Sequence, residues 1–318
     1  MKLSRRSAIR LSTAGALALT NGSLCHGQGS RPGFRLGAPI FLDTQDPYLL
    51  AREHRRLGFS AAYCPTFASL SDSKTIQLIE QSFAAQDVMI AEVGAWCNML
   101  DPDPVKRKAN LDHVAERCAV ADEVGSRCCV NIAGSYNKDS WFGPDPHNLS
   151  RDFFEATVQN CRYILDQVKP KRTRFTIEMM GWNLPDGPDS YLELLRAVAR
   201  KAFGVHLDVC NGINSPRRFY ENSAFIRECF QKLGPWIVSC HGKDLKWMIE
   251  MNVHFQETVP GQGQIDYGTY LEEIAKLNAD VPLMLEHLSS TAEYEEARQY
   301  VQRVATGRGL LLADQLHE

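Results

Sequence analysis

The residues best suited to chemistry follow four consecutive apolar runs in the second half of the chain: Glu178, Asp208, His241 and Glu286. Side chains alternate with a period of two along a strand, so all four can point to the same end of a sheet. Three carboxylates at an apolar site would repel one another strongly unless a cation neutralised them. The set predicts one divalent metal ion, and Mn²⁺, Mg²⁺, Co²⁺ or Zn²⁺ suits these ligands. The alternative is four isolated polar groups, each bonded to a neighbouring loop.

The elements that must position these residues alternate regularly from residue 34 onward. Predicted strands span 34–40, 60–65, 88–96, 127–133, 174–180, 204–210, 236–241 and 282–287. Predicted helices span 46–57, 72–86, 104–124, 151–168, 187–201, 216–232, 266–277 and 292–304, many of them opened by Asp, Ser or Pro. Eight β/α units predict an α/β fold, a single (β/α)8 TIM barrel over residues 34–310, rather than an open doubly wound sheet. In such barrels the active site lies at the C-terminal ends of the strands.

Residues 1–27 have the composition of an export signal. The pair Arg5-Arg6 and two further basic residues, with no acid, precede a short apolar run over 11–20. That run is too short to span a bilayer, which needs about 20 apolar residues. The pattern predicts a signal peptide of the twin-arginine type, and the alternative is a disordered basic tail.

Removal of this segment takes away four positive charges and no negative ones, so the formal net charge changes from −3 to −7. An acidic domain is a poor general binder of nucleic acid. No later stretch has the 18 or so uninterrupted apolar residues of a membrane span. We therefore expect an exported, periplasmic protein without stable membrane insertion and without a nucleic-acid partner. Its ten cysteines include no Cys-x-x-Cys pair and favour buried thiols over a disulfide framework.

The four strand ends resemble those of the xylose isomerase-like TIM-barrel family, which includes sugar isomerases and epimerases. The resemblance covers nearly the whole chain after the export signal. Its most specific parts are Glu178, Leu-Asp208, His241-x-Lys243-Asp244, Leu-Glu286 and the segment Pro260-Gly261-Gln-Gly263-Gln-Ile-Asp266. The resemblance implies that Glu178, Asp208, His241 and Glu286 bind one divalent metal ion, usually manganese. It also implies that Glu178 and Glu286 act as proton acceptor and donor on the substrate.

Two departures from the family pattern narrow this expectation. Sugar 3-epimerases commonly carry a histidine three residues after the strand-six aspartate, and this chain has Asn211 there. The family's apurinic endonucleases use additional histidines on strands two to four, where this chain offers Cys64-Pro65, Trp96-Cys97-Asn98 and Asn131. The resemblance therefore favours a sugar enzyme over a DNA-repair enzyme.

Further polar and aromatic residues near the strand ends are candidates for binding a substrate. They are Trp96, Asn98, Trp182, His206, Asn211, Lys243 and His254. The aromatic residues could equally serve packing, His206 could orient Asp208 or lie in the core, and Lys243 could form a salt bridge. His287 alternates outward from Glu286 and is left out. The long connections 245–264 and 131–149 are candidate lids or interfaces.

A metal ion that polarises a carbonyl eases removal of the neighbouring proton, and a glutamate on each face then directs the outcome. The function we expect is a metal-dependent sugar isomerase or epimerase that acts through an enediolate on a non-phosphorylated carbohydrate. The alternative is a lyase that eliminates the aglycone from a 3-keto-glycoside. A non-catalytic carbohydrate-binding barrel is a further alternative, and a homo-oligomer is compatible with the resemblance.

Overall fold

The computed structural model describes residues 33–277 and 280–312. Eight parallel strands form its central sheet, with bounds β1 Gly33–Ala38, β2 Ala61–Tyr63, β3 Met89–Gly94, β4 Cys128–Asn131, β5 Arg174–Glu178, β6 Phe203–Leu207, β7 Ile237–Gly242 and β10 Pro282–Leu285. Each strand pairs with the next one along the chain, and β10 pairs with β1 to close the ring. The predicted single (β/α)8 barrel is thereby confirmed.

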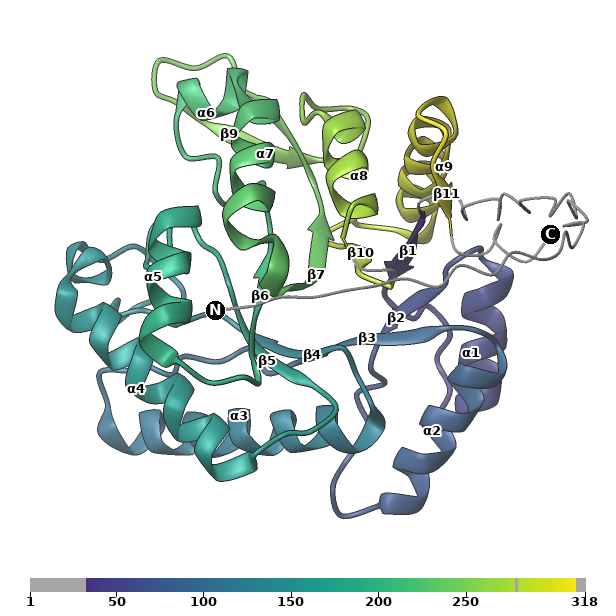
Figure 1. The fold of residues 1–318 in the computed structure, drawn as a ribbon, viewed down its shortest axis with the longest axis horizontal. Helices are drawn as coiled ribbons and strands as arrows, with labels where there is room; N and C mark the ends of the chain where they lie inside the picture. The colour runs from purple at the N-terminus through teal and green to yellow at the C-terminus, as the bar shows by residue number, and fades with distance from the viewer. Residues whose placement is uncertain (1–32, 278–279, 313–318) are drawn as a thin grey trace, which may run out of the picture. The chain divides into compact units, whose positions relative to one another are not determined.

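Helices lie outside the ring of strands (Figure 1). Their bounds are α1 Pro47–Arg56, α2 Ser73–Ala85, α3 Pro104–Val124, α4 Arg151–Val168, α5 Pro188–Val198, α6 Pro216–Tyr220, α7 Asn222–Leu233, α8 Tyr267–Ala275 and α9 Thr291–Gly307. Side chains that precede the helices cap them: Asp103 Oδ1, for example, accepts a hydrogen bond from Val105 N at 2.8 Å. Such caps satisfy backbone N–H groups that have no partner within the helix, and they explain why Asp and Ser marked the predicted starts.

Two predicted segments differ in detail from the structure. The helix expected over 216–232 is divided at Glu221 into α6 and α7. The connection expected over 245–264 contains an antiparallel hairpin of β8 (Asp244–Trp247) and β9 (Phe255–Thr258). A further short strand, β11 (Leu311–Leu312), pairs with β1.

The barrel interior changes character along its axis. Ala61, Ala91 and Met284 form a small apolar cluster, and Gly37 lies so close to Met284 that a Cβ at residue 37 would collide with the Met284 sulfur. Glu92, His206, Ser239 and His241 are also fully buried within the strands. The strand registers place Glu178 beside His206 and His241 beside Met284, so the four predicted metal ligands all lie near the C-terminal end of the barrel.

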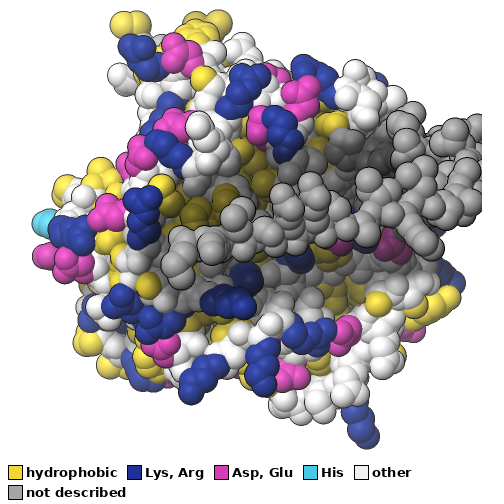
Figure 2. Space-filling view, viewed as in Figure 1, with side chains coloured by type: hydrophobic (Ala, Val, Ile, Leu, Met, Phe, Trp, Pro, Cys, Tyr) yellow, Lys and Arg dark blue, Asp and Glu magenta, His cyan; other side chains and the backbone are white. Residues whose placement is uncertain are grey.

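The described surface carries charges of both signs (Figure 2), and the described cysteines are mostly buried. On the face shown in Figure 2, Lys and Arg side chains lie among Asp and Glu side chains. The nine cysteines within the described residues are free, and eight of them are buried. Among the described helices, none has the length and apolarity needed to span a bilayer. The predicted export signal over 1–27 lies outside the described residues.

Candidate active site

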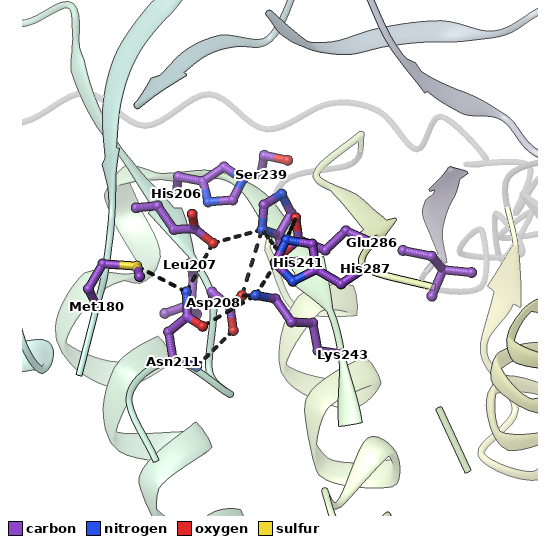
Figure 3. Close-up of polar contacts among 12 residues, drawn as sticks. Met180, His206, Leu207, Asp208, Asn211, Ser239, His241, Lys243, Glu286 and His287 are labelled. Carbon is purple, nitrogen blue, oxygen red and sulfur yellow. Dashed lines mark hydrogen bonds and ion pairs between the residues drawn. The ribbon is translucent and has the colours of Figure 1, made fainter. Parts of the chain in front are cut away.

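The four predicted metal ligands meet at the mouth of the barrel. Glu178 is the last residue of β5, Asp208 follows β6, His241 lies near the end of β7, and Glu286 follows β10. One ligand atom from each residue can be chosen so that all four atoms lie within 4.8 Å of one another. Figure 3 shows Asp208, His241 and Glu286 pointing toward one another from their separate strands. The convergence follows from parallel strands that all present their carboxyl ends to the same side of the barrel.

The imidazole of His241 is the centre of this group. Its Nδ1 lies 2.9 Å from Glu178 Oε1, 2.7 Å from Glu286 Oε1 and 3.7 Å from Asp208 Oδ2. Asp208 and His241 are fully buried, and Glu178 and Glu286 are largely buried. Three carboxylates are therefore concentrated around one ring nitrogen in a region of low solvent exposure.

The donor set fits a divalent cation. Asp208 Oδ2 and Glu286 Oε1 are buried oxygens that accept no hydrogen bond of good geometry from a described residue and are contacted only through ion pairs. A buried carboxylate oxygen without a hydrogen bond is costly, and a metal ion is one way to satisfy it. Carboxylate oxygens with one imidazole suit hard to borderline divalent ions. Glu178, Asp208, His241 and Glu286 are thus the residues that would hold the metal.

Lys243 is a second positive group beside these carboxylates. Its Nζ lies 3.0 Å from Asp208 Oδ2 and 2.8 Å from Glu286 Oε1. Burial alone would lower the pKa of Lys243, but the Asp208 and Glu286 carboxylates raise it well above its ordinary value. The lysine therefore carries its charge, and it both forms salt bridges and faces the cavity.

Asn211 ties the strand-five and strand-six ligands together. Its side-chain Nδ2 donates to Glu178 Oε1 at 3.2 Å, and its backbone N–H donates to Asp208 Oδ1 at 3.0 Å. Its Oδ1 accepts from Lys243 Nζ at 3.3 Å. The amide that replaces the family's histidine is therefore a neutral link between carboxylates, and it also lines the cavity.

The two glutamates have opposite pKa shifts. Burial raises the pKa of Glu178, and the nearby His241 offsets only part of that rise. Burial acts on Glu286 in the same direction, but His241 and Lys243 lower its pKa below the ordinary value. His241 and Lys243 also lower the pKa of Glu178, but there they do not outweigh its burial. Lys243 Nζ lies in direct contact with Glu286, at 2.8 Å from its Oε1.

Below the ligand group lies a buried acid that the sequence analysis did not select, Glu92. Its Oε1 accepts hydrogen bonds from His206 Nε2 at 2.9 Å and from Ser239 Oγ at 2.5 Å, and its Oε2 lies 3.3 Å from His241 Nε2. Burial would raise the pKa of Glu92, but the adjacent His206 and His241 lower it. The sequence signal that could have identified Glu92 is the presence of an acidic residue inside the apolar run 88–96.

The sequence left His206 either a role beside Asp208 and the substrate or a place in the core. The structure favours the core, because the ring is fully buried and its Nε2 faces Glu92. His206 lies within β6, whereas Asp208 lies beyond its end, so the two side chains occupy different levels of the barrel. His206 belongs to the buried layer below the ligands.

A cavity of about 600 Å³ opens above the ligands. Its polar lining consists of Glu178, Asn211, Lys243, Glu257, Glu286 and His287. Its aromatic lining consists of Tyr63, Trp96, Trp141, Phe142, Trp182 and Tyr294. Trp96 and Trp182 were predicted from the sequence. Tyr63 in β2, Tyr294 in α9 and the loop residues Trp141 and Phe142 were not, because no distinguishing pattern marks them.

Besides His206, two further candidate substrate residues do not line this cavity. Asn98 is buried, and its Oδ1 accepts hydrogen bonds from the backbone N–H groups of Leu100 at 3.0 Å and Ser135 at 2.9 Å. It therefore joins the loops that follow β3 and β4. His254 is exposed in the β8–β9 hairpin, where its Nδ1 lies 3.1 Å from Glu250 Oε2. Neither position supports the predicted contact with a substrate.

His287 shows the opposite outcome, because it was expected to face outward and instead lines the cavity. Its backbone has a φ of 59°, a left-handed conformation that is uncommon for a residue other than glycine. That conformation interrupts the alternation of side chains after β10. The His287 Nδ1 lies 2.9 Å from Glu257 Oε2, so the β8–β9 hairpin also contributes to the cavity wall.

Comparison with known proteins places these features in context. The sequence profile of the family described as Xylose isomerase-like TIM barrel matches residues 49–304. A search of proteins with curated functions found no significant match. Among solved structures, a xylose isomerase-like TIM barrel protein from Mycobacterium smegmatis in complex with magnesium is 16% identical, with a TM-score of 0.63 over 86% of this chain and 97% of the other.

Two further similar structures carry named activities. The 3-keto-D-glucoside 4-epimerase from E. coli is 11% identical, with a TM-score of 0.62 over 86% of this chain and 99% of the other. The probable 3-DHS dehydratase from Bacillus anthracis is 17% identical, with a TM-score of 0.62 over 86% of this chain and 99% of the other. At such identities the likeness shows the shared fold.

Proposed function

The chain belongs to the xylose isomerase-like TIM barrel family, and on that premise we propose that it is a divalent-metal-dependent isomerase or epimerase of a non-phosphorylated carbohydrate. The observation that carries the proposal is the convergence of four ligands, Glu178, Asp208, His241 and Glu286, at the barrel mouth. Two of them, Glu178 and Glu286, line the cavity. A pure binding protein has no need of two glutamates beside a cation site, whereas proton transfer at carbon needs an acid and a base.

A divalent ion in this site would supply electrostatic stabilisation of the negative charge that develops on a carbonyl oxygen. Manganese is the ion that we propose, and magnesium, cobalt and zinc also suit the ligands. Lys243 adds a fixed positive charge beside Asp208 and Glu286, and its Nζ can donate a hydrogen bond to a substrate oxygen.

The two glutamates would transfer the proton from and to the substrate carbon. One carboxylate removes the proton from the carbon next to the carbonyl, and the electron pair of that C–H bond forms the enediolate. The other carboxyl group returns a proton to the opposite face or to the neighbouring carbon. Glu178 and Glu286 both line the cavity, so both can reach a bound sugar. The pKa of Glu178 is raised and the pKa of Glu286 is lowered, so the two carboxyl groups differ in their affinity for a proton.

The charge of the cavity supports a substrate without a phosphate group. Among the described residues that line it, Lys243 is the only lysine or arginine, and two carboxylates already contact its ammonium group. Phosphate recognition usually relies on arginine forks, free lysines or a helix N-terminus. A neutral or oxidised sugar makes no such demand.

A lyase is the second candidate function, and it is supported by a cavity that is large enough for a sugar and its leaving group. The carbanion that gives the enediolate also expels a leaving group bonded to the carbon β to the carbonyl. In a 3-keto-glycoside this step breaks the bond to the aglycone oxygen, which leaves with a proton, and forms a carbon–carbon double bond. The cavity extends from the ligands to the aromatic wall and offers space for that aglycone.

We further propose that the protein is exported to the periplasm through its twin-arginine-type segment. The basis is the sequence of residues 1–27 alone. Replacement of Arg5 and Arg6 by lysine should retain the protein in the cytoplasm, as measured by cell fractionation. Unchanged export of that variant would contradict the proposal.

The experiment that tests the reaction is exchange of carbon-bound substrate hydrogen with D₂O, followed by NMR. Free ketoses, aldoses and 3-keto-glycosides form the panel, and chelated enzyme is the control. Exchange with an intact, altered sugar supports the isomerase or epimerase. Release of the aglycone with an unsaturated keto-sugar supports the lyase. Ligand binding without exchange or release, equal in the Glu178→Gln variant, would instead indicate a binding protein.

A further inference from the structure

The cavity has two chemically different sides. The carboxylates and Lys243 lie at the ends of β5, β6, β7 and β10, whereas four large aromatic side chains come from the loops after β3, β4 and β5. These aromatic residues are Trp96, Trp141, Phe142 and Trp182. The polar side accounts for the proposed reaction, and the aromatic side takes no part in it.

The four aromatic side chains are unusually exposed for their size. Their exposed fractions are 43% for Trp96, 39% for Trp141, 45% for Phe142 and 37% for Trp182. Large apolar side chains that gather in one concave exposed area usually mark a binding site, because their exposure is otherwise unfavourable. These side chains come from three separate loops, so their common exposure does not result from the position of one loop alone.

The wall is held in place by polar contacts of its loops. The indole N–H of Trp182 donates to the carbonyl oxygen of Phe142 at 2.5 Å, and the rings of Trp141 and Phe142 meet edge to face with centroids 5.3 Å apart. Asn148 Nδ2 donates to Gly143 O at 3.1 Å and fixes the same loop. A Cβ at Gly94 would collide with the Trp96 indole, so glycine permits that ring position. A preformed wall binds at a lower entropic cost than one that must be ordered by its ligand.

The volume of the cavity indicates the size of the ligand that it accommodates. Cavities of roughly 300–1,000 Å³ hold drug-sized ligands, which are larger than a single hexose. A hexose bound at the carboxylates and Lys243 would not fill a cavity of 600 Å³, and the aromatic residues line the remaining space that we assign to a second group. Aromatic rings bury a flat apolar surface, such as the C–H face of a pyranose or a planar aromatic group.

We propose that Trp96, Trp141, Phe142 and Trp182 form a subsite for the second ring of a glycoside, so that the substrate is a glycoside rather than a free monosaccharide. The inference rests on the proposed function for the position of the first ring. The second ring is either another sugar or an aromatic aglycone, and both present the flat apolar face that the wall fits.

The test compares glycosides that differ only in the second group. Calorimetry measures the binding of methyl glycosides, phenyl glycosides and disaccharides of glucose, galactose and xylose to the metal-loaded protein. The wild type should bind the phenyl glycoside or the disaccharide about tenfold more tightly than the matching methyl glycoside. The Trp141→Ala variant should lose that preference. The Trp236→Ala variant is the matched control, because Trp236 is 41% exposed but lies before β7, at the other end of the barrel.

The possible outcomes separate the subsite from the reaction. A preference for phenyl glycosides alone assigns an aromatic aglycone, and a preference for disaccharides alone assigns a sugar. Equal affinity for methyl and ringed glycosides, an equal loss in the Trp236→Ala control, or no binding by any member of the panel would overturn the subsite. A preference that depends on Trp141, without proton exchange or release in D₂O, would retain the subsite and refute the proposed reaction.

Discussion

Replacement of Glu92 by glutamine should weaken metal binding although Glu92 is not itself a ligand of the proposed metal. For His241 Nδ1 to bind a metal ion it must present a lone pair, so a neutral ring must carry its proton on Nε2. That proton faces Glu92 Oε2 at 3.3 Å, within a group of residues that is fully buried. A carboxylate that accepts the second N–H of a metal-binding histidine fixes the ring and its tautomer.

The glutamine side chain can keep only one of the two acceptor atoms. If its oxygen takes the place of Oε1, it still accepts from His206 and Ser239, and its NH₂ group then faces His241 Nε2. Two donors would oppose each other, and the ring would move its proton to Nδ1, the atom needed for the metal. One charge-assisted hydrogen bond is worth about 1.5–3 kcal/mol. The expected loss of metal affinity is therefore roughly 10- to 100-fold, or about 1.4–2.7 kcal/mol.

The assay is calorimetric titration of Mn²⁺ into metal-free protein, accompanied by thermal unfolding of the same samples. Glu80→Gln is the matched control, since Glu80 is partly exposed on α2 and pairs with Arg172 far from the mouth. An unchanged dissociation constant for Mn²⁺ in a folded Glu92→Gln variant would refute the reasoning. A lower melting temperature with unchanged metal affinity would show that Glu92 serves only the stability of the barrel.

Three further predictions concern the ligands, the acid–base pair and a buried histidine. The Asp208→Ala and His241→Ala variants should each purify with less metal than the wild type by elemental analysis, and full occupancy in both would contradict the assigned site. The Glu178→Gln variant should lose turnover by about 10²- to 10⁴-fold while still binding ligand, as measured by kinetics and calorimetry side by side. Burial lowers the pKa of His54 to about 4, and its Nε2 donates to Ala61 O at 2.7 Å. As the pH falls below 6.5, the imidazole of His54 takes up a proton in the unfolded chain but stays neutral in the folded protein. The free energy of unfolding should therefore fall by about 3 kcal/mol between pH 6.5 and pH 4. A His54→Gln variant should lose this contribution, as measured by denaturant titrations at both pH values.

The sequence predicted those parts of the protein that depend on local pattern. Alternation of short β-rich runs with amphipathic runs determined the number and order of the strands, and the polar residues at strand ends identified Glu178, Asp208, His241 and Glu286. Both signals are repetitive and are set by neighbours along the chain. The bounds shifted by a few residues because hydrogen bonding, rather than hydropathy, ends a strand.

The parts that were missed depend on contacts between distant strands. Glu92 and His206 are 114 residues apart, and only the closed barrel places one opposite the other. His287 was expected to face outward because strand alternation was extended past the end of β10, where a left-handed residue changes the direction of the chain. The aromatic wall comes from irregular loops, whose course no periodicity describes.

The arrangement separates the chemistry of the site from its substrate preference. The proposed metal ligands lie on rigid strand ends, and Glu92 supports His241 from within the barrel, so substitutions in the loops leave these groups in place. The aromatic wall is built on the loops after β3, β4 and β5, and loops of this kind tolerate changes of length and sequence better than strands do. Trp141 and Glu92 therefore act on different quantities: the first should change affinity for the second ring at constant metal affinity, and the second should change metal affinity at constant preference for that ring. A variant of either residue that altered both quantities equally would show that loop and barrel are coupled, and the division drawn between reaction and substrate would then be wrong.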